Sequence, residues 1–264
     1  VRARCLMPFI RSQGADIYWK VEGDTAAPSL VLLNSIGTDM DLWDAAIPAL
    51  RHRFSLLRID TRGHGASDAP AGDYELSMLA GDVAAAMDAA DVEAALVAGV
   101  SLGGMIAMQL AMDAPERVTG LALICTSATM DRSAWTARVE KVREEGVAGI
   151  ADLAMSRFLS PSFVQARPEI AASVRRGLLC MEPAGYAGCA AAIRDMDIAD
   201  RLQTISVPTL VVSGDRDTST PFVGHGEHLI ERISGAQHVM LDAAHLAPLD
   251  APNALADAII DAFV

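Results

Sequence analysis

Short apolar runs alternate with helical patterns along most of this 264-residue chain, and this alternation limits its possible folds most. The apolar runs are Ser29–Asn34, Phe54–Asp60, Ala94–Val100, Val118–Cys125, Pro208–Ser213 and His238–Asp242. The helical patterns are Leu42–Leu50, Leu76–Ala90, Leu102–Asp113, Phe222–Ile233 and Asn253–Phe263. Most of the apolar runs are unbroken, which is typical of strands covered on both faces. The sequence therefore predicts an α/β fold with a mostly parallel, doubly wound sheet.

Two regions depart from this alternation. Phe9–Ser12 and Ala15–Val21, on either side of Gly14, predict an antiparallel hairpin at the edge of the sheet. Residues 129–195 contain no strand-like run and are rich in alanine and helix-forming residues. Because loops of this length in compact domains are usually functional, residues 129–195 are predicted to form a helical lid on a core of residues 1–128 and 196–264. An elaborate crossover connection is the alternative.

The amino-acid composition favours a globular protein and argues against nucleic-acid and membrane partners. Apolar residues make up 52% and charged residues 21%, which is typical of a globular chain. The net charge of −13 repels phosphate backbones and anionic lipid, so neither nucleic acid nor a membrane is an expected partner. The four cysteines, Cys5, Cys125, Cys180 and Cys189, have no paired spacing and are expected to be free thiols in a cytoplasmic protein. Residues 1–6 are expected to be a dispensable extension before Met7.

The segment Gly99-Val100-Ser101-Leu102-Gly103-Gly104 joins a predicted strand directly to a predicted helix. A G-x-S-x-G match is weak by itself, and a glycine-rich turn with an incidental serine is the alternative. The strand-to-helix setting makes it specific, because a reversal this tight forces the serine into a strained backbone conformation and leaves no room for neighbouring Cβ atoms. The motif thus predicts a nucleophilic Ser101 at a helix N-terminus.

A serine nucleophile needs a base, and His245 is the predicted one. It follows the last predicted strand, at the edge of the sheet where Ser101 lies, and it comes last in the order serine, acid, histidine. His64 also follows a strand and stays open as an alternative. The other histidines are expected elsewhere: His225 and His228 on a solvated helical face, His52 on the surface, and His238 at the opposite end of its strand.

The acid that orients the base is predicted to be Asp217, which stands past the strand end in Gly214-Asp215-Arg216-Asp217. Asp215 is the alternative, with a pairing to Arg216 or a turn-stabilising role as its expected function. The oxyanion hole is predicted from two backbone amides, those of Leu102 and of Ile36 in the loop after Ser29–Leu33.

No cofactor or metal is expected. His225-x-x-His228 has no third candidate ligand near it in sequence. Gly63-His64-Gly65 lacks the features of a phosphate loop and of a dinucleotide fingerprint.

Together these segments resemble the α/β-hydrolase superfamily over nearly the whole chain, and 3-oxoadipate enol-lactonases in particular. The closer resemblance rests on Leu33-Asn34-Ser35-Ile36-Gly37-Thr38 with Trp43, on Asp60-Thr61-Arg62-Gly63-His64-Gly65-Ala66-Ser67, on the Ser101 motif, on Trp135, and on Gly185-Tyr186-Ala187 with Cys189–Asp197. Two segments depart from the family pattern: Ala247-Pro248-Leu249-Asp250 after His245, and Thr-Ser-Thr-Pro after Asp217.

The resemblance implies an α/β-hydrolase fold with an inserted helical lid, and hydrolysis of 3-oxoadipate enol-lactone in bacterial breakdown of aromatic acids. Such a substrate is a small lactone carrying a carboxylate, for which the lid arginines Arg132, Arg138, Arg157 and Arg194 are candidates, each with a solvated surface role as its alternative. Trp135, Arg138 and Asn34 are the expected substrate contacts, although Trp135 also fits a lid core. Other small-ester, perhydrolytic or carbon–carbon bond hydrolases remain open, as does a ligand receptor of this fold; the oligomeric state is not indicated.

Overall fold

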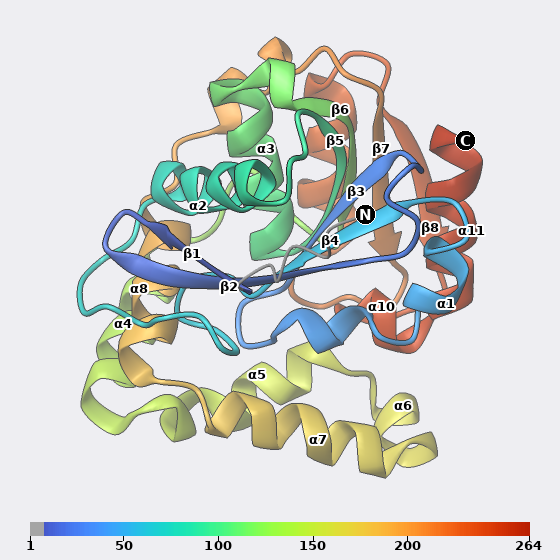
Figure 1. Cartoon of the computed structure of the whole chain (residues 1–264). Coiled ribbons are helices and arrows are strands. Elements are labelled where there is room, and N and C mark those ends of the chain that lie inside the picture. The colour runs from blue at the N-terminus through green and yellow to red at the C-terminus, as the bar shows by residue number, and fades with distance from the viewer. Residues whose placement is uncertain (1–7) are drawn as a thin grey trace.

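The computed structural model describes residues 8–264 and confirms an α/β fold built on one eight-stranded sheet (Figure 1). The order across the sheet is β1-β2-β4-β3-β5-β6-β7-β8. Pairing is parallel from β4 through β3 to β8, whereas β1–β2 and β2–β4 are antiparallel. The strands are β1 (Phe9–Ser12), β2 (Ala15–Glu22), β3 (Ser29–Leu33), β4 (Ser55–Ile59), β5 (Ala95–Val100), β6 (Val118–Ile124), β7 (Thr209–Gly214) and β8 (Gln237–Leu241).

Helices cover both faces of the sheet, with α2 and α3 on one face and α1 and α11 on the other (Figure 1). The α-helices are α1 (Ile47–Leu50), α2 (Leu76–Ala89), α3 (Leu102–Asp113), α4 (Arg132–Glu145), α5 (Ala151–Phe158), α6 (Pro161–Ala166), α7 (Pro168–Leu179), α8 (Pro183–Asp195), α9 (Glu227–Arg232), α10 (Ala247–Asp250) and α11 (Pro252–Phe263). Shorter helical turns are η1 (Met40–Trp43), η2 (Pro115–Arg117), η3 (Val147–Ile150), η4 (Ala199–Thr204) and η5 (Phe222–Gly226). Every residue of β4 and β5 is buried, as the unbroken apolar runs predict.

The predicted edge hairpin is confirmed as β1 and β2. Its two central turn residues, Gln13 and Gly14, have φ of 41° and 84°. Two consecutive residues with positive φ make the tight turn whose twist matches that of the flanking strands.

Two predicted helices are interrupted. Leu42–Leu50 is divided into η1 and α1, because Pro48 lacks an N–H and is accommodated only in the first turn of a new helix. Phe222–Ile233 is broken where Val223 is extended (ψ 123°) and Gly224 has a φ of 82°. Only Glu227–Arg232 continues as the regular helix α9.

The chain between β6 and β7 forms only helices, and those that precede η4 we call the inserted helices (α4, η3, α5, α6, α7 and α8). Proline and glycine residues in this stretch mark where the inserted helices begin and end. Pro161, Pro168 and Pro183 each begin a helix, and Gly146 ends α4 with a φ of 72°. In Figure 1 helices α5, α6 and α7 lie together at the bottom of the view, below the sheet.

Helix α8 and the loop after β4 are in direct backbone contact. A Cβ atom built on Gly63 would lie 2.5 Å from the Gly185 Cα atom, and one built on Gly185 would lie 2.5 Å from the Gly63 Cα atom. The neighbouring Arg62 guanidinium pairs with both carboxylate oxygens of Asp82 in α2, each at 2.7 Å, and both side chains are buried. The loop is thereby fixed between α2 and α8.

Among residues 8–264, Cys125, Cys180 and Cys189 are free thiols; the predicted extension at residues 1–6 lies outside the described part of the chain. None of the helices within residues 8–264 combines the length and the apolar character that a bilayer crossing requires.

Candidate active site

The parallel register gathers several strand ends at one edge of the sheet. Leu33 pairs with Gly99, and Val100 pairs with Ile124, so the loops after β3, β5 and β6 start side by side. Loops that leave the carboxyl ends of parallel strands commonly carry the functional residues of such folds. Ser101 and Ile36 lie in two of these loops, and Asp217 and His245 follow β7 and β8, which continue the parallel pairing beyond β6.

Ser101 occupies the sharp turn between β5 and α3, with a φ of 55° and a ψ of −115°. The flanking glycines are sterically required: a Cβ on Gly99 would lie 2.2 Å from the Gly103 backbone, and one on Gly103 would lie 2.6 Å from the Leu33 carbonyl oxygen. The Ser101 backbone is also held, because its carbonyl accepts the Thr126 hydroxyl at 2.6 Å. A strained serine fixed in this way is the arrangement expected of a nucleophile at a strand-to-helix turn.

The structure brings Asp217, rather than Asp215, to His245. The His245 Nδ1 atom lies 2.9 Å from Asp217 Oδ2, and both side chains are buried. Asp215 is exposed instead; its carboxylate accepts the Ala243 N–H at 3.1 Å and lies 4.0 Å from the Arg216 guanidinium. With Nδ1 engaged by Asp217, His245 has its Nε2 atom left for a nucleophile.

Several donors stabilise the Asp217 carboxylate. It accepts the Ser219 N–H at 2.7 Å, the Thr220 N–H at 3.2 Å and the Thr220 hydroxyl at 2.9 Å. Burial alone would raise the pKa of Asp217, but the charge and hydrogen bond of His245 together with the backbone donors lower it below its ordinary value. The carboxylate is therefore ionised and suited to hold an imidazolium.

Ser101 and His245 are both buried, and the hydrogen bonds of residues 8–264 do not include one between the Ser101 hydroxyl and His245. Such contacts often tighten only when substrate is bound. The Phe158 ring lies parallel to the His245 imidazole, 12° from coplanar and with centroids 6.2 Å apart. The Leu246 N–H donates to the Phe158 carbonyl, so α5 is attached to the histidine loop.

The two amides predicted for the oxyanion hole lack acceptors. Among the described residues, neither the Ile36 N–H nor the Leu102 N–H donates a hydrogen bond. The Leu102 amide belongs to the first turn of α3, where N–H groups have no partner within the helix. Two free amides on loops that start side by side make a suitable site for a developing negative charge.

The other histidines divide into different environments. His64 is buried, and its Nε2 atom accepts the Gly37 N–H at 2.9 Å. His225, expected on a solvated face, is instead half-buried, and its Nδ1 atom lies 2.8 Å from the hydroxyl of Ser127, which follows β6. Burial lowers the pKa of His225. No group of three or more potential ligands within residues 8–264 is arranged to hold a metal ion.

The residues expected to contact substrate differ in how many of their side-chain atoms already have partners within the protein. Asn34 is buried and donates from Nδ2 to the Ile59 carbonyl at 2.9 Å, while its Oδ1 atom has no partner among residues 8–264. Trp135 is buried in the inserted helices, and the Arg138 guanidinium lies 4.5 Å from the centre of its ring. Arg138 also approaches the hydroxyl of buried Tyr186 at 3.5 Å.

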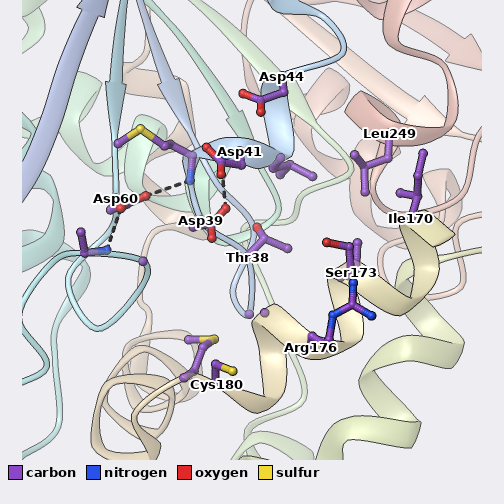
Figure 2. Close-up of a pocket in the computed structure, with 18 of the residues that line it drawn as sticks. Thr38, Asp39, Asp41, Asp44, Asp60, Ile170, Ser173, Arg176, Cys180 and Leu249 are labelled. Atoms are coloured by element: carbon purple, nitrogen blue, oxygen red, sulfur yellow. Dashed lines mark hydrogen bonds between the residues drawn. The ribbon is translucent and has the colours of Figure 1, made fainter.

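An open groove of about 1040 Å³ lies between α7 and the chain segment that follows β3 (Figure 2). Ser101, Asp217 and His245 are not among its lining residues, although Gly37, next to Ile36, is. Its lining includes five carboxylates, those of Asp39, Asp41, Asp44, Asp60 and Glu169, and two basic groups, Lys20 and Arg176. This acidic lining does not suit a negatively charged ligand.

Sequence reasoning missed three neighbours of the His245–Asp217 pair. Thr220 belongs to the Thr-Ser-Thr-Pro segment that departs from the family pattern, and that departure is the signal that could have found it. Cys125 has a φ of 45°; burial and the adjacent Asp217 carboxylate raise the pKa of its thiol. Phe158 comes from the inserted helices, and nothing in its local sequence indicates a contact with His245.

Known proteins resemble this chain in sequence and in fold. The chain is 33% identical over 251 residues to 3-oxoadipate enol-lactonase 2 of Acinetobacter baylyi, covering 95% of this chain and 94% of that one. The crystal structure of the enol-lactonase from Burkholderia xenovorans LB400 matches with a TM-score of 0.93 and 33% identity, over 96% of this chain and 98% of that one. A hydrolase from Pseudomonas aeruginosa PA01 matches with a TM-score of 0.92 and 37% identity, over 96% of both chains.

The strained serine turn, the mostly parallel sheet and these similarities agree with the family-level match. The family described as alpha/beta hydrolase fold matches residues 28–252, which is most of the chain. The relatives and the family support hydrolase activity. This chain belongs to the α/β-hydrolase fold family.

Proposed function

We propose that this protein is a serine hydrolase that opens 3-oxoadipate enol-lactone with water to give 3-oxoadipate. The observation that carries the proposal is the buried 2.9 Å contact between His245 Nδ1 and Asp217 Oδ2. Both residues lie in loops at the same edge of the sheet as the strained Ser101. The enol-lactonases of Acinetobacter baylyi and Burkholderia xenovorans support the substrate, since both are about one-third identical over nearly the whole chain.

In the first half of the proposed reaction, His245 Nε2 takes the proton of the Ser101 hydroxyl as the Ser101 oxygen attacks the lactone carbonyl. Asp217 holds the imidazole through Nδ1 and stabilises its positive charge. The Ile36 and Leu102 amides donate to the carbonyl oxygen as it becomes negative. The ring C–O bond then breaks, the enol oxygen leaves and is protonated, and an acyl-Ser101 ester remains.

In the second half, His245 removes a proton from water, which attacks the acyl-Ser101 carbonyl. The same two amides stabilise the second oxyanion, and Ser101 leaves with the proton held by His245. The released enol tautomerises to the ketone, so the overall reaction adds one water to the lactone. The chemistry requires no metal or cofactor.

Residues 129–195 act in this proposal as a cap over the core of residues 1–128 and 196–264. The support is local: Phe158 of α5 stacks on His245, and a Cβ atom on Gly37 would lie 3.0 Å from Leu178 of α7 and 3.2 Å from Phe158. Helix α5 therefore contacts both the histidine loop and the loop of Ile36, and α7 contacts the loop of Ile36. Excluding water from such a site strengthens its electrostatic interactions.

The inserted helices also supply cations for the substrate's carboxylate. Arg132 and Arg194 are already engaged, since both pair with Asp195 and Arg194 also pairs with Asp73. Arg138 and Arg157, in contrast, form no ion pair within residues 8–264. Both lie near the buried Tyr186 hydroxyl, whose pKa is raised by burial and partly lowered by these two charges. We therefore assign carboxylate recognition to Arg138 and Arg157, with Trp135 as the wall beside Arg138.

The test follows the loss of enol-lactone absorbance with purified protein, beside 4-nitrophenyl acetate as a simple ester. The wild-type protein should consume the lactone much faster than the ester, and Ser101→Ala should lose both activities. Arg138→Ala and Arg157→Ala should raise KM for the lactone and leave KM for the uncharged ester unchanged. Rapid ester turnover without lactone turnover would overturn the substrate assignment, and substantial activity of Ser101→Ala would overturn the mechanism.

A further inference from the structure

The buried imidazole of His64 has no part in the proposed mechanism, yet it contacts the oxyanion loop directly. Its Nε2 atom accepts the Gly37 N–H at 2.9 Å, and its Nδ1 atom lies 3.2 Å from the Arg62 carbonyl. Because Nε2 accepts, the ring proton is on Nδ1 and donates to Arg62. Burial lowers the pKa of His64 to about 4, so this neutral form is the one present near neutral pH.

The contact falls on the peptide that decides the shape of the oxyanion loop. Ser35–Thr38 is a four-residue turn closed by the Thr38 N–H donating to the Ser35 carbonyl at 3.2 Å, and Gly37 in its third position has a φ of 85°. In a type II turn the third residue has a positive φ and the second residue does not. Type I and type II turns differ by a flip of the central peptide, here the one between Ile36 and Gly37.

Both ends of this central peptide are held. His64 accepts its N–H, and the Ser35 hydroxyl donates to its carbonyl, that of Ile36, at 3.3 Å. The preceding peptide, which carries the Ile36 N–H, is held by Thr38, whose N–H and hydroxyl both donate to the Ser35 carbonyl. Since N–H and C=O point in opposite directions across a trans peptide, these bonds leave the Ile36 N–H directed away from the turn.

We propose that His64 is a positioning residue, which anchors the Ser35–Thr38 turn through the Gly37 N–H and so keeps the Ile36 amide, on the outer side of that turn, available to the oxyanion. The inference rests on the proposed function, because it assigns His64 a role only if Ile36 donates to a reacting carbonyl oxygen. Without His64, the Gly37 N–H is buried without an acceptor, and the turn is favoured to rearrange until that N–H finds one.

The loop that carries His64 takes one hydrogen bond from the imidazole, at the Arg62 carbonyl, and that carbonyl also accepts from the Cys189 thiol at 3.3 Å. Other bonds hold its shape. Asp60 accepts the Met40 and Ala66 amides at 2.8 Å each, the Ser67 hydroxyl donates to the Asp60 carbonyl at 2.7 Å, and Arg62 pairs with Asp82. On its other side the ring faces the Cys189 thiol of α8 at 3.9 Å, which adds packing but no charged partner. A change at His64 should therefore act mainly through Gly37.

The experiment compares His64→Gln with His64→Met. The two new side chains have nearly the same shape, but only glutamine has an acceptor oxygen at the position of Nε2. With 4-nitrophenyl acetate and with the enol-lactone, kcat of His64→Met should fall about 10- to 100-fold while KM changes little, because only the oxyanion interaction is weakened. His64→Gln should recover most of that loss. Hydrogen exchange of the Gly37 amide should be fast in His64→Met and slow in His64→Gln.

The outcomes separate this inference from the proposed function. Equal kcat losses in both variants with equal loss of melting temperature would mean that His64 only fills space, and would overturn the inference. A wild-type kcat in His64→Met would overturn it as well. If Ser101→Ala remains active, the proposed function itself fails, whatever the His64 variants do.

Discussion

Replacing Gly103 by alanine tests the packing between the two segments that carry the proposed oxyanion amides, those of Ile36 and Leu102. A Cβ at this position would lie 2.6 Å from the Leu33 carbonyl oxygen and 2.9 Å from the Asn34 carbonyl oxygen. To bring that contact to even 3.0 Å, α3 and the end of β3 must separate by about 0.4 Å. That movement opens the gap between Leu102 on α3 and Ile36 on the loop after β3.

We expect Gly103→Ala to lower kcat about 10- to 100-fold with little change in KM, since small displacements of catalytic groups have effects of this size. The assay is steady-state hydrolysis of 4-nitrophenyl acetate, with the melting temperature as the check on folding. Gly177→Ala is the matched control: Gly177 lies inside α7 with nothing within 4 Å of a built Cβ. It should keep wild-type kcat and gain about 0.5–1 kcal/mol of stability.

A folded Gly103→Ala protein with wild-type kcat would refute the reasoning, because it would mean that the distance between the two amides does not control turnover. A similar loss of kcat in Gly177→Ala would refute it too, since that substitution meets no neighbour.

Three further outcomes are expected. Asp217→Asn should lower kcat about 10³- to 10⁴-fold with the fold intact, measured by ester hydrolysis, because the amide no longer holds the correct His245 tautomer. The free energy of unfolding should fall by about 3 kcal/mol as pH decreases from 6.5 to 4 on account of His64: its pKa is lowered to about 4, so the unfolded chain binds the extra proton in that window. Urea denaturation of wild type and His64→Gln over that range measures the difference, and equal pH dependence would contradict the burial effect. Asp82→Asn should destabilise the protein by about 3–5 kcal/mol in the same assay, since it leaves the Arg62 guanidinium buried without its carboxylate.

The sheet could be predicted from the sequence nearly to the residue. Strands buried on both faces read as unbroken apolar runs, and the predicted Phe54–Asp60 is observed as Ser55–Ile59. The helices were less predictable where proline or glycine acts inside an amphipathic pattern. Gly224 is an example, because its positive φ interrupts Phe222–Ile233 while the apolar spacing continues.

For the candidate site, chain order and strand ends predict which loops come together, and the observed pairing of His245 with Asp217 follows from them. What they do not give is the direction in which a buried group points. The contact between His64 and Gly37 depends on how one peptide is oriented in a turn, and the stacking of Phe158 on His245 depends on how an inserted helix docks. Such contacts join residues far apart in sequence and leave no local pattern.

The backbone contact between Gly63 and Gly185 makes α8 less tolerant of substitution than the other inserted helices. At that contact neither segment has room for a methyl group, so α8 has a fixed docking position. Helix α7, in contrast, buries only Ala171 and Leu178 along its length. New side chains should therefore accumulate on the exposed positions of α7, where this fold can acquire new specificities while its anchored helix stays unaltered.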